Sequence, residues 1–157
     1  MKKIFRISLL GSLLYTGLLS ADTTKMNFDT YLNSFDYEER KAMKIDSVEL
    51  TVMLEEGTTQ LIDIRFKEEF EAWHMKGAIN IPLNELPKRL NELDKSKLIV
   101  TACPHKDRAI MARTFLRLKG FKSAYLVDGL IGLAQYWRGD SAKEFIENYR
   151  KKDKTLP

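Results

Sequence analysis

Residues 97–108 decide the fold, and they read Lys-Leu-Ile-Val-Thr-Ala-Cys-Pro-His-Lys-Asp-Arg. Branched apolar residues fill the first half, a pattern typical of a strand buried inside a parallel sheet. The residues that follow predict a helix from about Arg108 to Leu118, which Gly120 ends at its C′ position. Cys103, the only cysteine, therefore lies between the carboxyl end of a strand and the amino end of a helix.

Strands and helices alternate on both sides of this stretch. Short apolar runs predict further strands at residues 61–64, 77–82 and 123–127. Helical spacing of apolar residues predicts helices at 27–44, 48–56, 66–73, 83–93, 130–137 and 142–150. We expect Ser47 to cap the second of these helices and Gly57 to end it. This alternation predicts an α/β domain, with a mainly parallel central sheet and helices on both faces.

The first 21 residues have the pattern of a secretory signal peptide. A cationic patch, Met1 to Arg6, runs into the apolar stretch Ile7 to Leu19 and then into Ser20-Ala21-Asp22. An apolar run of this length is shorter than the about 20 residues that a membrane-spanning helix needs. We therefore predict cleavage near Ala21 and a periplasmic or secreted product. No cysteine lies near the cleavage site, which excludes a lipoprotein anchor there.

The rest of the chain suits one domain. The expected organisation is an N-terminal helical extension at 22–45, a core domain at 46–150 and a flexible tail at 151–157. Of the 26 basic residues, three lie in the predicted signal peptide, which leaves 23 against 22 acidic residues. The remaining charges alternate in sign and form no basic stripe, so we predict no nucleic-acid partner. The apolar stripe of the extension could cover its own domain or form the seam of a homodimer.

The position of Cys103 favours a reactive thiolate. A helix amino terminus stabilises an anion and can lower the pKa of a thiol. The residues that follow form a candidate substrate-binding loop whose backbone N–H groups could surround the sulfur: Pro104, His105, Lys106, Asp107 and Arg108. Arg108 closes the loop and offers a fixed cation to the thiolate or to an anionic substrate. A ring of donors around a sulfur bonded to Cys103 is what a terminal persulfide anion requires.

Loop length separates two chemistries that share this design. Cysteine-dependent phosphatases place five residues between the cysteine and the arginine, which leaves room for a tetrahedral phosphate. Here four residues separate Cys103 from Arg108. The smaller ring suits one outer sulfur atom, so the spacing favours sulfur transfer over phosphoryl transfer.

Other polar residues are predicted to support the site. Asp63 at a strand end should accept loop N–H groups, Arg65 should pair with Glu69, and His74 should hydrogen-bond the backbone. The two histidines and the cysteine do not have zinc-site spacing, so no metal or other cofactor is expected. Cys-Pro-His is also the start of a thiol oxidase motif, but Lys106 stands where the second cysteine would be. A two-thiol redox cycle within one chain is therefore excluded.

Several motifs in order resemble the rhodanese family. The resemblance covers residues 46–140 and is carried by Leu61-Ile62-Asp63-Ile64-Arg65, Glu69-Phe70, His74, Gly77-Ala78, Asn80-Ile81-Pro82, Cys103 to Ala109, Asp128-Gly129 and Trp137. It implies a rhodanese-like fold and a sulfurtransferase that moves sulfane sulfur through a Cys103 persulfide. The implied donor is polysulfide or thiosulfate, and the implied acceptor is cyanide, a thiol or a sulfur-accepting protein.

Export and small size are similar to those of periplasmic polysulfide sulfurtransferases. Pro104 has no N–H, and Asp107 offsets one positive charge beside Arg108, so we predict that polysulfide or a persulfide is a better donor than thiosulfate. Trp73, Met75 and Lys76 replace the family's frequent Gly, Ile and Pro, and the loop lacks the usual glycine; these departures bear on substrate preference. The alternative is a non-catalytic or sulfur-carrying interaction module in the periplasm.

Overall fold

A computed structural model describes residues 26–152. Its elements are, in chain order, α1 (Phe28–Asn33), α2 (Tyr37–Ala42), β1 (Lys44–Ile45), α3 (Ser47–Glu56), β2 (Thr59–Asp63), α4 (Lys67–Ala72), β3 (Ala78–Asn80), the 3₁₀ turns η1 (Leu86–Lys88) and η2 (Leu90–Glu92), β4 (Leu98–Ala102), α5 (Asp107–Leu118), β5 (Ser123–Leu126), α6 (Gly129–Tyr136) and α7 (Asp140–Lys152). The predicted signal peptide, residues 1–21, and the end of the predicted tail lie outside the described residues.

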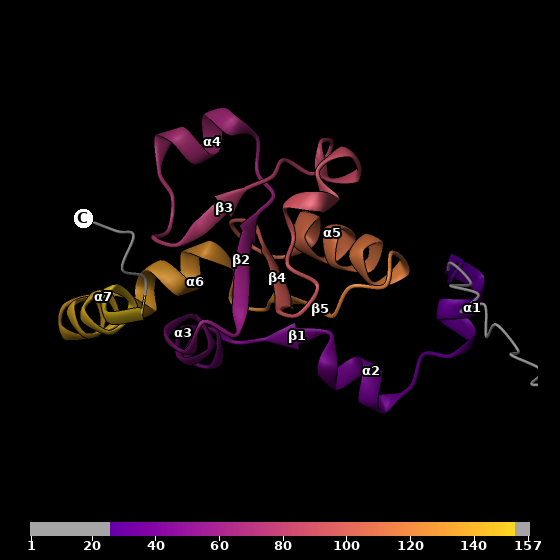
Figure 1. Ribbon diagram of the computed structural model, residues 1–157, viewed down its shortest axis with the longest axis horizontal. Helices are drawn as coiled ribbons and strands as arrows, with labels where there is room; N and C mark the ends of the chain where they lie inside the picture. The colour runs from indigo at the N-terminus through magenta and orange to yellow at the C-terminus, as the bar shows by residue number, and fades with distance from the viewer. Residues whose placement is uncertain (1–25, 153–157) are drawn as a thin grey trace, which may run out of the picture.

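All strand pairs in the described sheet are parallel, in the order β1-β5-β4-β2-β3 (Figure 1). The central strand is β4, the strand that ends just before Cys103. Its neighbours β2 and β5 also end close by, because Asp63 pairs with Ala102 and Thr101 pairs with Tyr125. The carboxyl ends of three strands therefore meet at one edge of the sheet, where ligands collect in open α/β folds.

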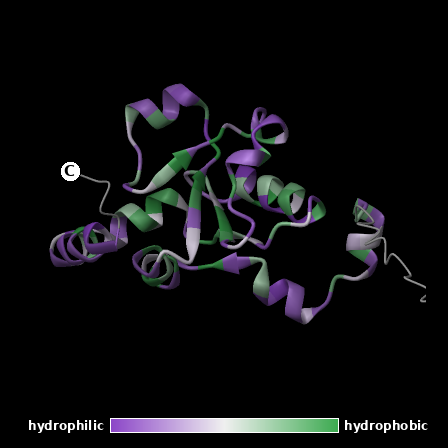
Figure 2. Ribbon diagram, viewed as in Figure 1, coloured by the Kyte–Doolittle hydropathy of each residue, from purple (hydrophilic) through white to green (hydrophobic). Residues whose placement is uncertain are grey.

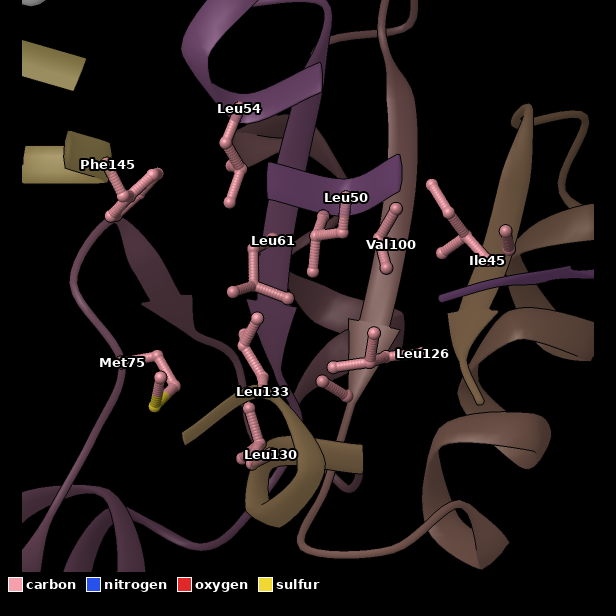
Figure 3. Packing of buried hydrophobic residues seen from close by; sticks show 12 residues of the cluster. Ile45, Leu50, Leu54, Leu61, Met75, Val100, Leu126, Leu130, Leu133 and Phe145 are labelled. Atoms are coloured by element: carbon pink, nitrogen blue, oxygen red, sulfur yellow. The ribbon is translucent and has the colours of Figure 1, made fainter. Parts of the chain in front are cut away.

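Helices cover both faces of the sheet, as the sequence predicts. One face packs against α3, α6 and α7, and Figure 3 shows Leu50, Leu54, Leu61, Leu130 and Leu133 together in that layer. The other face packs against α5 and the 3₁₀ turns, through buried residues that include Ile99, Ala112, Leu116 and Leu86. Helices α4 and α7 consist largely of hydrophilic residues (Figure 2). The core thus lies in two apolar layers, and Cys103 belongs to the layer beneath α5.

The N-terminal extension is two short helices, so the single helix expected over 27–44 is wrong. The Asn27 side chain caps α1, and the Asp36 side chain accepts a hydrogen bond from Glu39 N and starts a new helix as α2. Helix α1 ends at its C-cap Ser34, and the extended backbone of the N-cap Asp36 separates it from α2. Figure 1 shows α1 and α2 leading away from the sheet on the side of β1. Within residues 26–152, no helix is long and apolar enough to cross a bilayer.

Three smaller expectations also differ from the structure. Asp46, and not Ser47, caps α3, since its side chain accepts hydrogen bonds from Val48 N and Glu49 N. The helix expected over 83–93 is two 3₁₀ turns, because Pro87 has no N–H to donate to a preceding carbonyl. The strand β1 was missed, since two residues are too few to show a periodicity.

Candidate active site

The amino end of α6 donates hydrogen bonds to the loop that follows β4. Leu130 N donates to the carbonyl of Cys103 at 2.9 Å, and Ile131 N donates to the carbonyl of Pro104 at 3.3 Å. Gly129 has φ 64°, and a Cβ there would lie 2.3 Å from the His105 oxygen, so a side chain cannot fit. The loop carbonyls are thus occupied on the α6 side, and the backbone N–H groups of His105 and Ala109 are left to face the sulfur.

Cys103 is completely buried, and its thiol donates to Asp107 Oδ1 at an Sγ–O distance of 3.5 Å. Burial raises the pKa of the thiol, and the Asp107 carboxylate raises it further. Hydrogen bonds from the N–H groups of Ala109 and His105 lower the pKa, each by less than burial raises it, and the net shift is upward. The predicted lowering of the thiol pKa is therefore wrong, because desolvation disfavours the thiolate more than the helix terminus stabilises it.

Arg108 is directed at α4. Its guanidinium makes two hydrogen bonds to the Glu69 carboxylate, at 2.7 and 2.9 Å. The Arg108 hydrogen bond is the main reason that the pKa of Glu69 falls to about 2, and Phe66 N also donates to the same carboxylate. The sequence predicts that Arg108 offers a fixed cation to the thiolate or to an anionic substrate; the guanidinium is fixed, but by Glu69, and its charge interacts with Cys103 without a hydrogen bond in this structure. Both guanidinium NH₂ groups are bonded to Glu69.

The expected ion pair between Arg65 and Glu69 is also wrong. Arg65 instead pairs with Asp63, with 2.6 Å between Nη2 and Oδ2, and both side chains are buried. Arg65 N also donates to Asp63 Oδ1 at 3.1 Å, so the strand-end aspartate does accept a loop N–H group. Nη2 of Arg65 reaches the carbonyl of Trp73 at 2.7 Å, and the guanidinium lies over the indole ring. This pair ties the end of β2 to the end of α4, which fits its predicted supporting role.

His74 and the outer loop residues lie where solvent reaches them. The His74 ring stacks on Phe70, and its Nδ1 lies 3.1 Å from the Phe70 carbonyl oxygen, an arrangement that fits a role in the scaffold. His105 and Lys106 are exposed at the tip of the loop, and Pro104 is half-buried. In residues 26–152, no group of three His, Cys, Asp or Glu side chains could hold a metal ion.

Two roles at the site were not predicted from the sequence. Asp107 was assigned to the loop only as a charge, although its place four residues after Cys103 and at the start of α5 brings its carboxylate back to the sulfur. Glu69 was assigned to the wrong arginine, because helical spacing predicts partners within one element and Arg108 is 39 residues away. No local sequence pattern indicates a contact over that separation.

Comparisons with known proteins agree with the fold. The family model described as Rhodanese-like domain matches residues 46–132. Two Bacillus subtilis (strain 168) proteins are similar: the uncharacterized protein YqhL, 40% identical over 70 residues, and the putative sulfur carrier protein YrkF, 39% identical over 62 residues. These matches cover 45% and 40% of this chain, and 56% and 34% of the relatives.

A solved structure has the same fold in part of a longer chain. The crystal structure of reduced Bacillus anthracis CoADR-RHD is 35% identical, with a TM-score of 0.54. The match covers 60% of this chain and 17% of the other. In all three comparisons, the similar region is less than two thirds of the other protein.

Proposed function

Because the chain belongs to the rhodanese-like domain family, we propose that it is a sulfurtransferase that carries sulfane sulfur as a persulfide on Cys103. One observation carries the proposal: the only sulfur nucleophile lies at the carboxyl end of the central strand, and N–H groups of its own loop are bonded to it. An outer sulfur atom on Cys103 would carry negative charge. Fixed backbone donors stabilise such a charge without reorganising during the reaction.

Two exchanges make up the reaction. First, Cys103 Sγ attacks the outer sulfur of the donor; the Sγ–S bond forms, the S–S bond of the donor breaks, and the leaving group takes that electron pair. The thiol proton passes to the leaving group or to solvent. Second, cyanide or a thiol attacks the outer sulfur of the persulfide, and the electron pair returns to Sγ. The protein ends as it began, and no external oxidant or reductant is consumed.

The donor that the site favours is a polysulfide or a persulfide. Thiosulfate is a dianion whose oxygens need several donors, whereas Pro104 supplies no N–H and Arg108 is already bonded to Glu69. Lys106 is the exposed cation left in the loop. Lys106→Ala should therefore reduce the use of thiosulfate more than the use of polysulfide, and side-by-side kcat/KM values with both donors test this expectation.

The test of the function is a sulfur adduct on an intact protein. Incubation with a sulfane donor should raise the mass by one or more sulfur atoms, and cyanide should remove them as thiocyanate. Cys103→Ser should give neither adduct nor turnover, and full activity in that variant would reject the assignment. Aryl phosphate hydrolysis that depends on Cys103 would contradict our interpretation of the loop length.

A sulfur carrier is the second candidate function. The relative YrkF is named a putative sulfur carrier protein. A carrier would form the mass adduct and release it only to a partner protein, whereas the enzyme would turn over with cyanide.

We also propose that the protein works after export. Support comes from the cationic and apolar pattern of residues 1–21, which precede the part of the chain that the structure describes. A periplasmic fraction should contain a shortened chain that begins near Asp22, and N-terminal sequencing would identify it. A full-length N-terminus in the membrane fraction would argue against cleavage.

A further inference from the structure

The two arginines near the Cys103 loop are both paired with carboxylates. Arg108 is bonded to Glu69 of α4, and Arg65 is bonded to Asp63 at the end of β2. On the α6 side, the carboxylate of Asp128 accepts hydrogen bonds from Ser47 N and Oγ. In the loop itself, the exposed residues are His105, Lys106 and Asp107, and the Asp107 carboxylate contacts the sulfur. The charge in direct contact with Sγ is therefore a carboxylate.

We infer that Asp107 is a specificity-determining residue, whose carboxylate holds the hydrogen of the Cys103 thiol and disfavours dianionic sulfur donors at the site. The inference rests on the proposed function and names the residue that sets its donor class. The predicted donors are those of low charge, such as a hydropersulfide of a small thiol. Thiosulfate and doubly ionised inorganic polysulfide are the disfavoured class, so of the two donors proposed above the inference favours persulfides.

The Asp107 carboxylate is fixed beside the resting thiol. Asp107 Oδ1 lies 3.5 Å from Sγ, and the carboxylate is itself held by the backbone N–H of Arg108, which helps to lower its pKa. A fixed anion at this distance disfavours any second negative charge on the sulfur. Arg108 cannot offset this charge fully, because Glu69 neutralises it. Cys103 thus rests as a neutral thiol.

The same carboxylate acts on the incoming donor. A donor must bring its outer sulfur against Sγ, so its other atoms come close to Asp107. Coulombic repulsion grows with the charge of the donor, and it is about twice as large for a dianion as for a monoanion. A neutral hydropersulfide has no such penalty, and its own proton can leave with the products. Asp107 therefore separates donors by charge.

Asp107→Asn tests the inference, because it keeps the size and an oxygen acceptor but removes the charge. Ultraviolet absorbance of the thiolate, with the Cys103→Ser protein as the blank, gives the titration of the only thiol. Its midpoint should move to lower pH, and the thiolate fraction at neutral pH should rise about tenfold. The ratio of kcat/KM for thiosulfate to that for the persulfide of 2-mercaptoethanol, whose charge is at most −1, should also rise about tenfold.

Asp94→Asn is the matched control. Asp94 precedes β4 at the opposite end of the strand, and its carboxylate contacts Ser96. It should change neither the titration nor the donor ratio. Asp107→Glu retains the charge and should keep the donor ratio within about twofold of that of the unchanged protein. A change in the donor ratio of both Asp107 variants would therefore indicate a folding defect and not the loss of charge.

Two results would overturn the inference: an unchanged thiol titration in Asp107→Asn, or equal changes in kcat/KM for both donors. Failure of the proposed function would look different. In that case the unchanged protein would form no sulfur adduct with any donor, while the thiol titration would still respond to Asp107.

Discussion

Two arginines on α5 have opposite environments. Arg108 is the second residue of the helix, at the candidate active site; its side chain is 28% exposed, and its partner Glu69 is 36% exposed. Arg113 lies five residues later with 1% of its side chain exposed. It donates to the carbonyl of Ser123 at 3.1 Å, to Tyr31 Oη at 2.6 Å and to the carboxylate of Glu39. One helix therefore carries a surface cation and a buried one.

Arg108 and Arg113 have different roles because they differ in burial. A partly exposed ion pair contributes little to stability, because water competes for both charges. A buried cation must have all its donors satisfied, and losing a partner is costly. Burial would raise the pKa of Glu39, but the hydrogen bond and charge of Arg113 lower it below its usual value. Arg113 thus fixes the N-terminal extension to α5, while Arg108 positions the reactive loop against α4.

The largest effect should come from Arg113→Leu. This change leaves the Glu39 carboxylate, the Tyr31 hydroxyl and the Ser123 carbonyl without their shared donor. Removing one partner of a buried pair costs about 3–5 kcal/mol, so the free energy of unfolding should fall by that amount. Urea unfolding followed by circular dichroism measures it.

Arg117→Leu is the control for that change. Arg117 lies on the same helix and reaches Glu39 at 3.5 Å, but its side chain is 39% exposed. We expect a loss of less than about 1 kcal/mol. Equal losses in the two variants would contradict the distinction between buried and exposed cations on α5.

Arg108→Gln should show the reverse pattern, with small loss of stability and large loss of activity. The Glu69 carboxylate can turn to water, so the free energy of unfolding should change by less than about 1 kcal/mol. The loop loses its tie to α4, and a displacement of about 1 Å at a reacting atom can reduce the rate about 100-fold. The loss of activity is measured as the rate of sulfur transfer at saturating donor. The change in stability is measured by unfolding curves of the same preparation. If the free energy of unfolding of Arg108→Gln fell by much more than about 1 kcal/mol together with the rate, a positioning role for Arg108 would be contradicted.

The features that the sequence predicts are those that depend on local patterns, and the features that it does not predict depend on tertiary contacts. Apolar runs and helical spacing depend on residues that are neighbours in the chain, so the parallel sheet, the position of Cys103 and the loop to Arg108 followed from them. The partners of buried charges depend on tertiary packing. Tyr31 and Arg113 are 82 residues apart, and nothing in either local pattern indicates their contact. For the same reason Glu69 was assigned to Arg65, its neighbour on the chain, instead of Arg108.

The direction of the Cys103 pKa shift also depends on tertiary packing. A helix amino terminus can be predicted from the chain, whereas complete desolvation of Cys103 depends on α6 closing over the loop. The favourable effect was visible in the sequence and the larger unfavourable one was not. Asp107 adds to the second effect, and its contact with Sγ depends on the turn between β4 and α5.

A smaller effect should follow from Tyr31→Phe. The change removes the hydroxyl that accepts a hydrogen bond from Arg113 Nη1 but keeps the buried ring. One lost hydrogen bond to a charged group should lower the free energy of unfolding by about 1.5–3 kcal/mol, less than the loss of Arg113 itself. Tyr37→Phe is the control, since Tyr37 is 85% exposed and should show almost no change. If Tyr31→Phe matched Arg113→Leu, the ring and not the charge network would hold the extension.

The smallest effect concerns pH and the exposed end of α5. The Arg108 hydrogen bond lowers the pKa of Glu69 from its ordinary value of 4.5 to about 2, so the folded protein holds this carboxylate ionised more strongly than the unfolded chain does. The resulting stability is fully present above pH 4.5 and is lost as the pH falls from 4.5 towards 2. Since Glu69 is 36% exposed, solvent screening should keep the contribution below about 1 kcal/mol.

Glu69→Gln should therefore be slightly less stable than the unchanged protein at neutral pH, and the difference should disappear in acid. Urea unfolding of both proteins at a series of pH values measures this difference. A difference that stayed constant down to the lowest pH would mean that the Gln variant is destabilised by packing at the start of α4 and not by the lost charge.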